Sequence, residues 1–307
     1  MGNEQKKIGS FVAQLRKQRG LTQQELAKLL KTSQSAVARI ERGEQNMSMD
    51  MILKMSDALD RQIVKLSTGG VNFRIEGGRK LSGSIEVKAS KNATVGLLCA
   101  SLLNKGTTTL KQVPRIEEVY RLIEVLESVG VSVKWLEGND LQIKPPAQLD
   151  LQNMNVEAAR KTRSVIMFMG PLMHLFDTFT IPYAGGCKLG TRTVRPHLYA
   201  LEEMGARIKT EEAVYRVDVP RRRSSEVVLY EAGDTVTENA LMAAAKMRGT
   251  TVLKFASANY MVQDLCFFLE ELGVKIDGIG TSTLTIHGKP DINTDVTYAP
   301  SEDPIEA

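Results

Sequence analysis

The chain repeats one phrase three times, as IEVLESVGVSV at 123–133, LYALEEMGARI at 198–208 and FFLEELGVKI at 267–276. Each phrase has the apolar spacing of an amphipathic helix that ends at a glycine, and a strand, a turn and a second strand follow it. A further helix and strand precede each phrase, as in AAAKMRGTTVLKFA at 243–256. The predicted repeating unit is therefore helix, strand, helix, strand, strand.

The marker glycines of the three phrases, Gly130, Gly205 and Gly273, lie roughly 70 residues apart, which is longer than the period of a typical solenoid. This period favours an α/β domain assembled from three βαβαββ-type units. Stretches such as 240–245 are apolar on every helical face, so we expect helices inside the domain and sheets outside it.

Three such units resemble one lobe of the enolpyruvyl transferase family, an inside-out α/β barrel whose members join two lobes around a cleft. Motifs of the family follow in order along the chain: KASKNATVGLL at 88–98, ARKTRSVIMFMGPL at 159–172, GGCKLGTR at 185–192 and TENALMAAA at 237–245. They are more similar to the branch that acts on UDP-N-acetylglucosamine than to the branch that acts on shikimate phosphate.

The resemblance implies catalytic roles for Cys187 and Lys91, and it implies a substrate-binding surface formed by Lys91, Asn92, Arg163, Arg192, Val194 and Thr237. Phosphoenolpyruvate carries close to three negative charges, and arginine and lysine match its phosphate and carboxylate oxygens. In the reaction of the family, a sugar hydroxyl attacks phosphoenolpyruvate while the enol methylene is protonated. This reaction needs a proton donor and a base, and the reactive cysteine of the family supplies acid or covalent assistance. We expect no metal and no cofactor.

Each of these residues has a plainer interpretation when it is taken alone. Cys187 would be an inert small residue, while Lys91 and Arg163 would be solvated charges. The ordered motifs favour the functional interpretation. His197 either contacts the substrate or packs, and the apolar surroundings of the remaining cysteines predict core positions for Cys99 and Cys266.

Departures from the family pattern leave the acceptor sugar open. After Arg192 the family usually reads Pro-Val-Asp-Leu-His, whereas this chain reads Thr-Val-Arg-Pro-His at 193–197, so that Arg195 replaces an acid. A Glu-Pro pair of the family is replaced by Asn259 and Tyr260.

The first 67 residues differ in character from the rest. Lys and Arg outnumber Asp and Glu there but not in the remainder, which indicates a polyanionic partner for this part alone. Apolar residues at helical spacing predict four short helices. Thr22 and Glu25 form a predicted capping box, and Thr32 or Ser33 is placed to cap the next helix.

The stretch LTQQELAKLLKTSQSAVARIERGEQ at 21–45 resembles the helix-turn-helix of the phage repressor (Cro/C1) family. The resemblance implies that the helix at 33–42 enters the major groove of double-stranded DNA. The DNA-binding residues would then be Gln23, Ser33, Gln34, Ser35 and Arg39. Such modules usually act as dimers, so a homodimer is considered; the alternative is a small helical bundle used for protein contact.

We therefore expect a helix-turn-helix domain at 1–67, a linker at 68–73 and one transferase lobe at 74–307. The tail TYAPSEDPIEA at 297–307 looks like the crossing into a second lobe that is missing, so we expect this chain by itself to be inactive. The alternative function is a transcription regulator whose transferase-derived body senses a sugar nucleotide. No apolar run reaches the roughly 20 residues of a membrane span and no signal peptide is evident, which predicts a cytoplasmic protein without a membrane partner.

Overall fold

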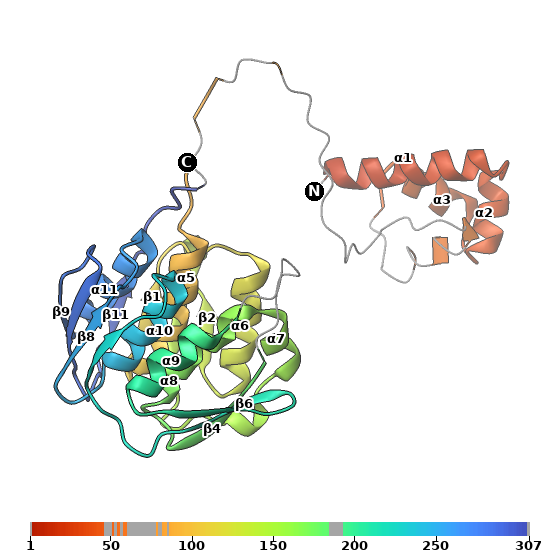
Figure 1. Ribbon diagram of the computed structural model, residues 1–307. Coiled ribbons are helices and arrows are strands. Elements are labelled where there is room, and N and C mark those ends of the chain that lie inside the picture. The colour runs from red at the N-terminus through yellow and green to blue at the C-terminus, as the bar shows by residue number, and fades with distance from the viewer. Residues whose placement is uncertain are drawn as a thin grey trace. The chain divides into compact units, whose positions relative to one another are not determined.

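The computed structural model describes residues 2–45, 51, 54, 55, 58, 59, 78, 82–84, 86–183 and 193–305. Its contacts divide the chain into two compact units, Met1–Ser82 and Gly83–Ala307 (Figure 1). The predicted linker, 68–73, lies outside the described residues.

The first unit contains three described helices, α1 (Gly2–Gln18), α2 (Gln23–Leu29) and α3 (Gln34–Glu41). The capping box between Thr22 and Glu25 is present at the start of α2, and Ser33 caps α3 through the backbone N–H of Ala36. These contacts confirm the predicted helix starts. The core gathers apolar side chains from all three helices and from the segment that follows: Val12, Leu15, Leu26, Ala27, Leu30, Val37, Ile40, Met55 and Leu59.

Helices α1 and α3 approach closely at Gly9. A methyl group at this position would lie 2.3 Å from the carbonyl oxygen of Ile40. Glycine therefore sets the distance between the two helices, because any side chain would force their backbones apart.

The second unit repeats the predicted pattern three times. The first copy comprises α5 (Lys91–Ala100), β1 (Thr108–Leu110), α6 (Glu117–Ser128), β2 (Ser132–Trp135) and β3 (Leu141–Lys144). The second comprises α7 (Val156–Lys161), the 3-10 helix η4 (Arg163–Phe168), α8 (Met169–Leu172), β4 (Thr178–Pro182), α9 (Arg195–Glu203), β5 (Arg207–Thr210) and β6 (Val214–Asp218). The third comprises β7 (Glu226–Val228), α10 (Asp234–Ala244), β8 (Thr250–Lys254), α11 (Tyr260–Glu271), β9 (Lys275–Asp277) and β10 (Thr283–His287).

The three sheets share one topology. Their antiparallel strands run in the orders β1-β3-β2, β4-β6-β5 and β8-β10-β9. Two further strands pair in parallel at the edges, β7 beside β8 and β11 (Val296–Tyr298) beside β1. The identical strand order shows that the repeated phrases correspond to repeated structure.

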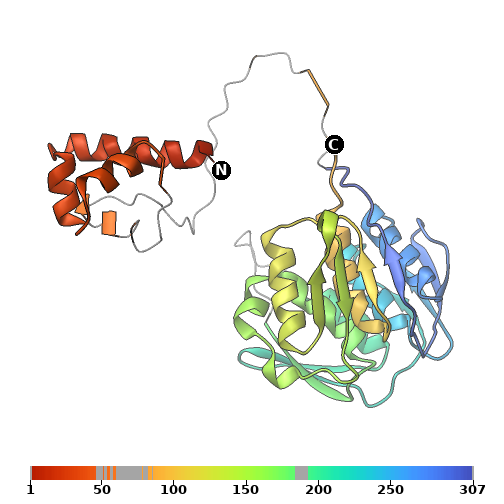
Figure 2. The same cartoon turned by 180° about the vertical axis from the view of Figure 1, so that it is seen from behind.

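Helices fill the interior of this unit and the sheets lie outside (Figures 1 and 2). Every residue of α10 from Val236 to Ala244 is buried, and α10 packs against α5, α8, α9 and α11. This arrangement confirms the predicted inside-out α/β fold. A helix that is buried on all sides is stable here because its faces meet other helices and sheet strands.

The tail packs against the first and third copies. Strand β11 pairs with β1, and the hydroxyl of Tyr298 donates to Asp264 Oδ1 at 2.6 Å. The backbone N–H of Ser301 donates to Asp264 Oδ2 at 2.8 Å. Thr297 and Tyr298 thus belong to a sheet of this unit, and the interpretation of 297–307 as a crossing into a second lobe stays a prediction.

Candidate functional site

The second unit contains a cavity of about 880 Å³ at which several helices begin. Lys91 opens α5, Arg163 opens η4, Asp234 opens α10 and Met261 lies in the first turn of α11, and all four residues line it. Helix N-termini carry partial positive charge and unpaired N–H groups. Their convergence suits a phosphate- or carboxylate-bearing ligand.

Two basic side chains, His174 and Lys246, lie at the opposite ends of these helices and have a structural role there. His174 Nε2 lies 2.7 Å from the carbonyl oxygen of Ala243, and Lys246 Nζ lies 3.4 Å from that of Leu103. These carbonyls belong to the last turns of the helices, where cations are favourable. Burial lowers the pKa of His174 to about 4, so its ring is neutral and Lys246 supplies the positive charge of this pair. Both side chains bind carbonyl oxygens near helix C-termini, and anion binding is better placed at the other end.

Lys91 forms an ion pair with Glu118 of α6, with 2.7 Å between Nζ and Oε2. Glu118 also accepts a hydrogen bond of 2.6 Å from Ser164. Burial by itself raises the pKa of Glu118, but the hydrogen bonds from Lys91 and Ser164 outweigh it and hold the pKa below its usual value. The carboxylate is ionised and fixes the position of the lysine. Glu118 lies in none of the sequence motifs, so only tertiary packing identifies it.

Arg163 and Asn92 line the same cavity as Lys91. The guanidinium of Arg163 donates to the carbonyl oxygen of Thr193 at 3.1 Å. This bond ties the second motif to the segment that leads into α9. The structure thus brings together three of the predicted substrate-binding residues, which come from the first and second copies of the repeat.

His197 borders the cavity and is only 3% exposed. The amide of Asn239 accepts from the N–H of Gly170 at 2.9 Å, so its Nδ2 faces His197 Nδ1 at 3.3 Å. Burial lowers the pKa of His197 to about 4, and the charge of Arg163 acts in the same direction. The ring is therefore neutral at pH 7, with its proton on Nε2.

That proton points towards Thr235, whose Oγ1 lies 3.4 Å from His197 Nε2. The sequence left His197 open between packing and substrate contact. Its burial gives it a packing role, and its place in the cavity lining keeps substrate contact a prediction.

Two predicted residues that the structure describes, Thr237 and Val194, do not line this cavity. Thr237 is fully buried, donates to the carbonyl oxygen of Gly233 at 2.8 Å and accepts from the N–H of Ser257 at 3.0 Å. Val194 precedes α9 and packs against the core. Cys187 and Arg192 lie outside the described residues. The roles of these four residues stay predictions.

The remaining cysteines behave as the sequence predicts. Cys99 and Cys266 are fully buried free thiols within the core of the unit. Burial raises the pKa of Cys266 to about 12 and raises that of Cys99 well above its usual value. Neither thiol forms the thiolate that nucleophilic chemistry requires.

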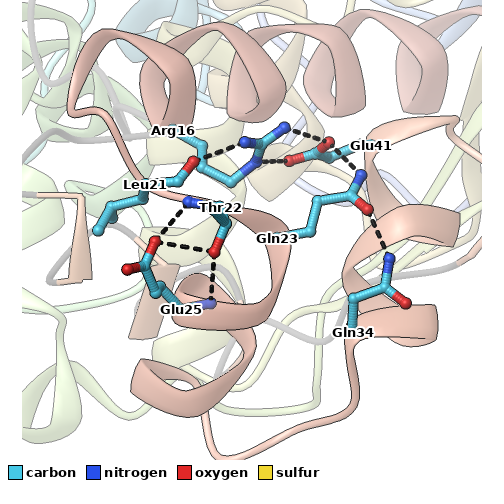
Figure 3. Close-up of polar contacts among 7 residues, drawn as sticks. All are labelled: Arg16, Leu21, Thr22, Gln23, Glu25, Gln34 and Glu41. Atoms are coloured by element: carbon cyan, nitrogen blue, oxygen red, sulfur yellow. Dashed lines mark hydrogen bonds and ion pairs between the residues drawn. The ribbon is translucent and has the colours of Figure 1, made fainter.

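In the first unit, hydrogen bonds connect the two helices of the predicted DNA-binding motif (Figure 3). Arg16 of α1 donates to Glu41 of α3 through Nε at 2.6 Å and through Nη2 at 3.1 Å. Gln23 donates to Glu41 at 2.9 Å, and Gln34 donates to Gln23 at 2.7 Å. The nearly buried ion pair of Arg16 and Glu41 thus orients Gln23, and Gln23 in turn orients the exposed amide of Gln34 at the start of α3.

The other predicted DNA-binding residues lie on the same helix as Gln34. Ser33, Ser35 and Arg39 are exposed on or just before α3. The hydroxyls of Ser33 and Ser35 are 3.0 Å apart, and Arg39 Nε donates to Gln45 at 3.2 Å. Their side chains are available on one short helix, as groove contact would require.

Among the helices that the structure describes, none has the length and apolar character needed to cross a membrane.

Family models match both units. The model described as EPSP synthase (3-phosphoshikimate 1-carboxyvinyltransferase) matches residues 75–307, and a helix-turn-helix model matches residues 12–66. The UDP-N-acetylglucosamine 1-carboxyvinyltransferase of Bradyrhizobium diazoefficiens is 37% identical over 77% of this chain and 54% of its own length. That of Dichelobacter nodosus is 36% identical over 70% of this chain and 51% of its own length. The chain spans about half the length of the curated relatives it matches.

Solved structures share the fold. The enolpyruvyl transferase NikO from Streptomyces tendae superimposes with a TM-score of 0.66 at 19% identity, over 76% of this chain and 55% of that one. An EPSP synthase from Acinetobacter baumannii gives a TM-score of 0.53 at 18% identity, over 70% of this chain and 49% of that one. With the family model matching most of the sequence, the chain belongs to the EPSP synthase family of enolpyruvyl transferases and carries a helix-turn-helix domain in front of it.

Proposed function

We propose that the second unit is a substrate-binding lobe of an enolpyruvyl transferase that acts on UDP-N-acetylglucosamine and phosphoenolpyruvate. The convergence of helix N-termini on the cavity that holds Lys91, Asn92 and Arg163 carries this proposal. Both ligands bear phosphate groups, which such an arrangement attracts. The names of the relatives supply the acceptor sugar.

The chemistry forms one C–O bond and breaks another. A sugar hydroxyl attacks C2 of phosphoenolpyruvate and loses its proton to a base, while an acid protonates C3. The C2–O bond to phosphate then breaks, and C3 gives up a proton to leave an enolpyruvyl ether and inorganic phosphate. Lys91 and Arg163 would stabilise the phosphate and carboxylate charge, and Cys187 would act as the acid, while Arg192, Val194 and Thr237 would support substrate binding.

Ligand binding by the chain tests the role of Lys91. Lys91→Met should weaken binding of UDP-N-acetylglucosamine or phosphoenolpyruvate at least tenfold in calorimetric titrations, because one charge-assisted contact contributes about 1.5–3 kcal/mol. Lys254→Met is a matched control: its ammonium pairs with Glu226 at 2.8 Å, and its side chain is 46% exposed, like that of Lys91. Equal affinities for the two variants would refute the assignment.

The role of Cys187 calls for a separate assay. Cys187→Ala should abolish phosphate release wherever the wild-type chain shows it, while binding of UDP-N-acetylglucosamine persists. Release of phosphate by the alanine variant at the wild-type rate would exclude the thiol as the acid.

We also propose that the first unit binds double-stranded DNA through α3. The helix-turn-helix match and the exposed side chains of Gln34, Ser35 and Arg39 support this proposal, with Ser33 and Gln23 as phosphate contacts. Affinity should fall steeply with salt, because basic side chains displace counterions. Arg39→Ala should weaken binding about tenfold or more in gel-shift titrations, and Arg207→Ala on β5 of the other unit is the charge-matched control.

The presence of both units on one chain favours a second candidate, a regulator that senses a sugar nucleotide. DNA affinity would then change when UDP-N-acetylglucosamine binds. The same gel shifts, repeated with and without the ligand, distinguish this candidate from a transferase whose DNA-binding unit acts independently, and their stoichiometry reports whether a homodimer binds.

A further inference from the structure

Glu238 lies in the motif TENALMAAA and lines the candidate cavity from the second turn of α10, yet no step of the proposed reaction uses its carboxyl group. The residue is 1% exposed. Within the part of the chain that the structure describes, Oε1 is fully buried and has no hydrogen-bond partner. A buried polar atom without a partner is costly to the fold, and such groups are rare in native proteins. A ligand bound in the cavity could supply a hydrogen-bond partner for the Glu238 carboxyl group.

The neighbouring helix leaves room for this carboxyl group. A methyl group at Gly96 of α5 would lie 2.6 Å from Glu238 Oε1. The side chain therefore occupies the space that any larger residue at 96 would take. Glycine at this position is the reason that a carboxyl group fits between α5 and α10.

The surroundings favour the uncharged form of the acid. Burial raises the pKa of Glu238 well above its usual value, and the charges of Asp234 on its own helix and Asp264 on α11 raise it further. From α5, the titratable group facing it is the thiol of Cys99, whose raised pKa keeps it neutral. These surroundings favour the protonated carboxyl group, which can donate a hydrogen bond.

A neutral acid also suits the charge balance of the cavity. The described lining has the cations Lys91 and Arg163 and the exposed or paired carboxylates Glu118, Glu231 and Asp234. An additional negative charge would repel a phosphate-bearing ligand, whereas an O–H group donates to its oxygen.

We propose that Glu238 is a ligand-binding residue, whose uncharged carboxyl group donates a hydrogen bond to an anionic oxygen of the ligand in this cavity. This inference rests on the proposed function of the second unit. The anionic oxygen belongs to phosphoenolpyruvate or to the diphosphate of the sugar nucleotide, and separate titrations distinguish the two sources.

The test compares stability with binding in Glu238→Leu. Loss of an unpartnered buried carboxyl should leave the unfolding midpoint unchanged or higher, measured through the fluorescence of Trp135, the only tryptophan of the chain. The same variant should bind one of the two ligands about tenfold more weakly, the effect of one lost hydrogen bond to a charged group. Glu127→Gln, which alters an exposed carboxylate of α6 outside the lining of the cavity, should change affinity little.

Glu238→Gln provides a second arm that does not depend on the leucine variant folding. The amide should retain affinity within about threefold, since it still donates a hydrogen bond. Wild-type affinity should fall as the pH rises through the pKa of Glu238, and the Gln variant should lack that fall.

The outcomes separate the two proposals. A wild-type chain that binds neither ligand refutes the proposed function and this inference together. Normal wild-type binding that persists in Glu238→Leu, with a raised unfolding midpoint, refutes this inference alone, because the carboxyl group would then be only a structural defect.

Discussion

Replacing Glu41 by glutamine removes one charge of the ion pair that joins α1 to α3. The side chains of Arg16 and Glu41 are 10% and 7% exposed, and the guanidinium is left with the carbonyl oxygen of Leu21 as its remaining strong acceptor. Breaking a fully buried pair from one side costs about 3–5 kcal/mol. These groups lie at the edge of a small core, so we expect a loss of about 2 kcal/mol.

Hydrogen exchange of the full chain measures this loss in the first unit separately. A loss of about 2 kcal/mol should lower the protection of the most protected amides of α1 and α3 roughly 30-fold. The matched control is Glu44→Gln. Glu44 pairs with Arg42 at 2.9 Å, but the side chain of Glu44 is 53% exposed and that of Arg42 is 60% exposed. An exposed pair contributes little, so protection should stay within about twofold in the control.

The pair also predicts a pH dependence. Burial by itself raises the pKa of Glu41, but hydrogen bonds from Arg16 and Gln23 reverse this and hold it below 4.5. A lowered folded-state pKa means that the contribution is present at neutral pH and is lost as the pH falls through that pKa. Equal protection in the two glutamine variants, or an unchanged acid response in Glu41→Gln, would refute this account of how α1 and α3 are held together.

Three further results are expected. Because the folded-state pKa of Glu238 is raised, wild-type stability should fall as the pH rises above about 4.5, by at most about 1.4 kcal/mol per pH unit; Glu238→Gln should remove this slope in Trp fluorescence melts. Gly9→Ala should destabilise the first unit by about 1–3 kcal/mol in exchange measurements, because the methyl group would lie 2.3 Å from the carbonyl oxygen of Ile40; wild-type protection would contradict the close approach. Cys99 and Cys266 should resist iodoacetamide in the native protein and react in urea, as mapped by mass spectrometry, because both thiols are buried; native labelling of either would place it outside the core.

The sequence determined much of this protein because its signals are local or repeated. A capping box at Thr22 and Glu25 is readable from two residues, since both partners lie within one helical turn. The three glycine-ended phrases predicted that one succession of helices and strands occurs three times, because each copy must bury the same apolar face, and the three sheets share one strand order. Motif order also located Lys91, Asn92 and Arg163, which the structure brings to one cavity.

Tertiary structure decided what depends on partners distant in the chain. Glu118 looks like any acidic residue in the first turn of a helix until packing places it 2.7 Å from Lys91. Thr237 lies in a motif with substrate-binding members, yet packing turns its hydroxyl towards backbone groups. The unpartnered carboxyl of Glu238 exists only because Gly96 lies opposite. The charge state, burial and hydrogen bonding of a side chain depend on the residues around it, and only folding brings those residues together.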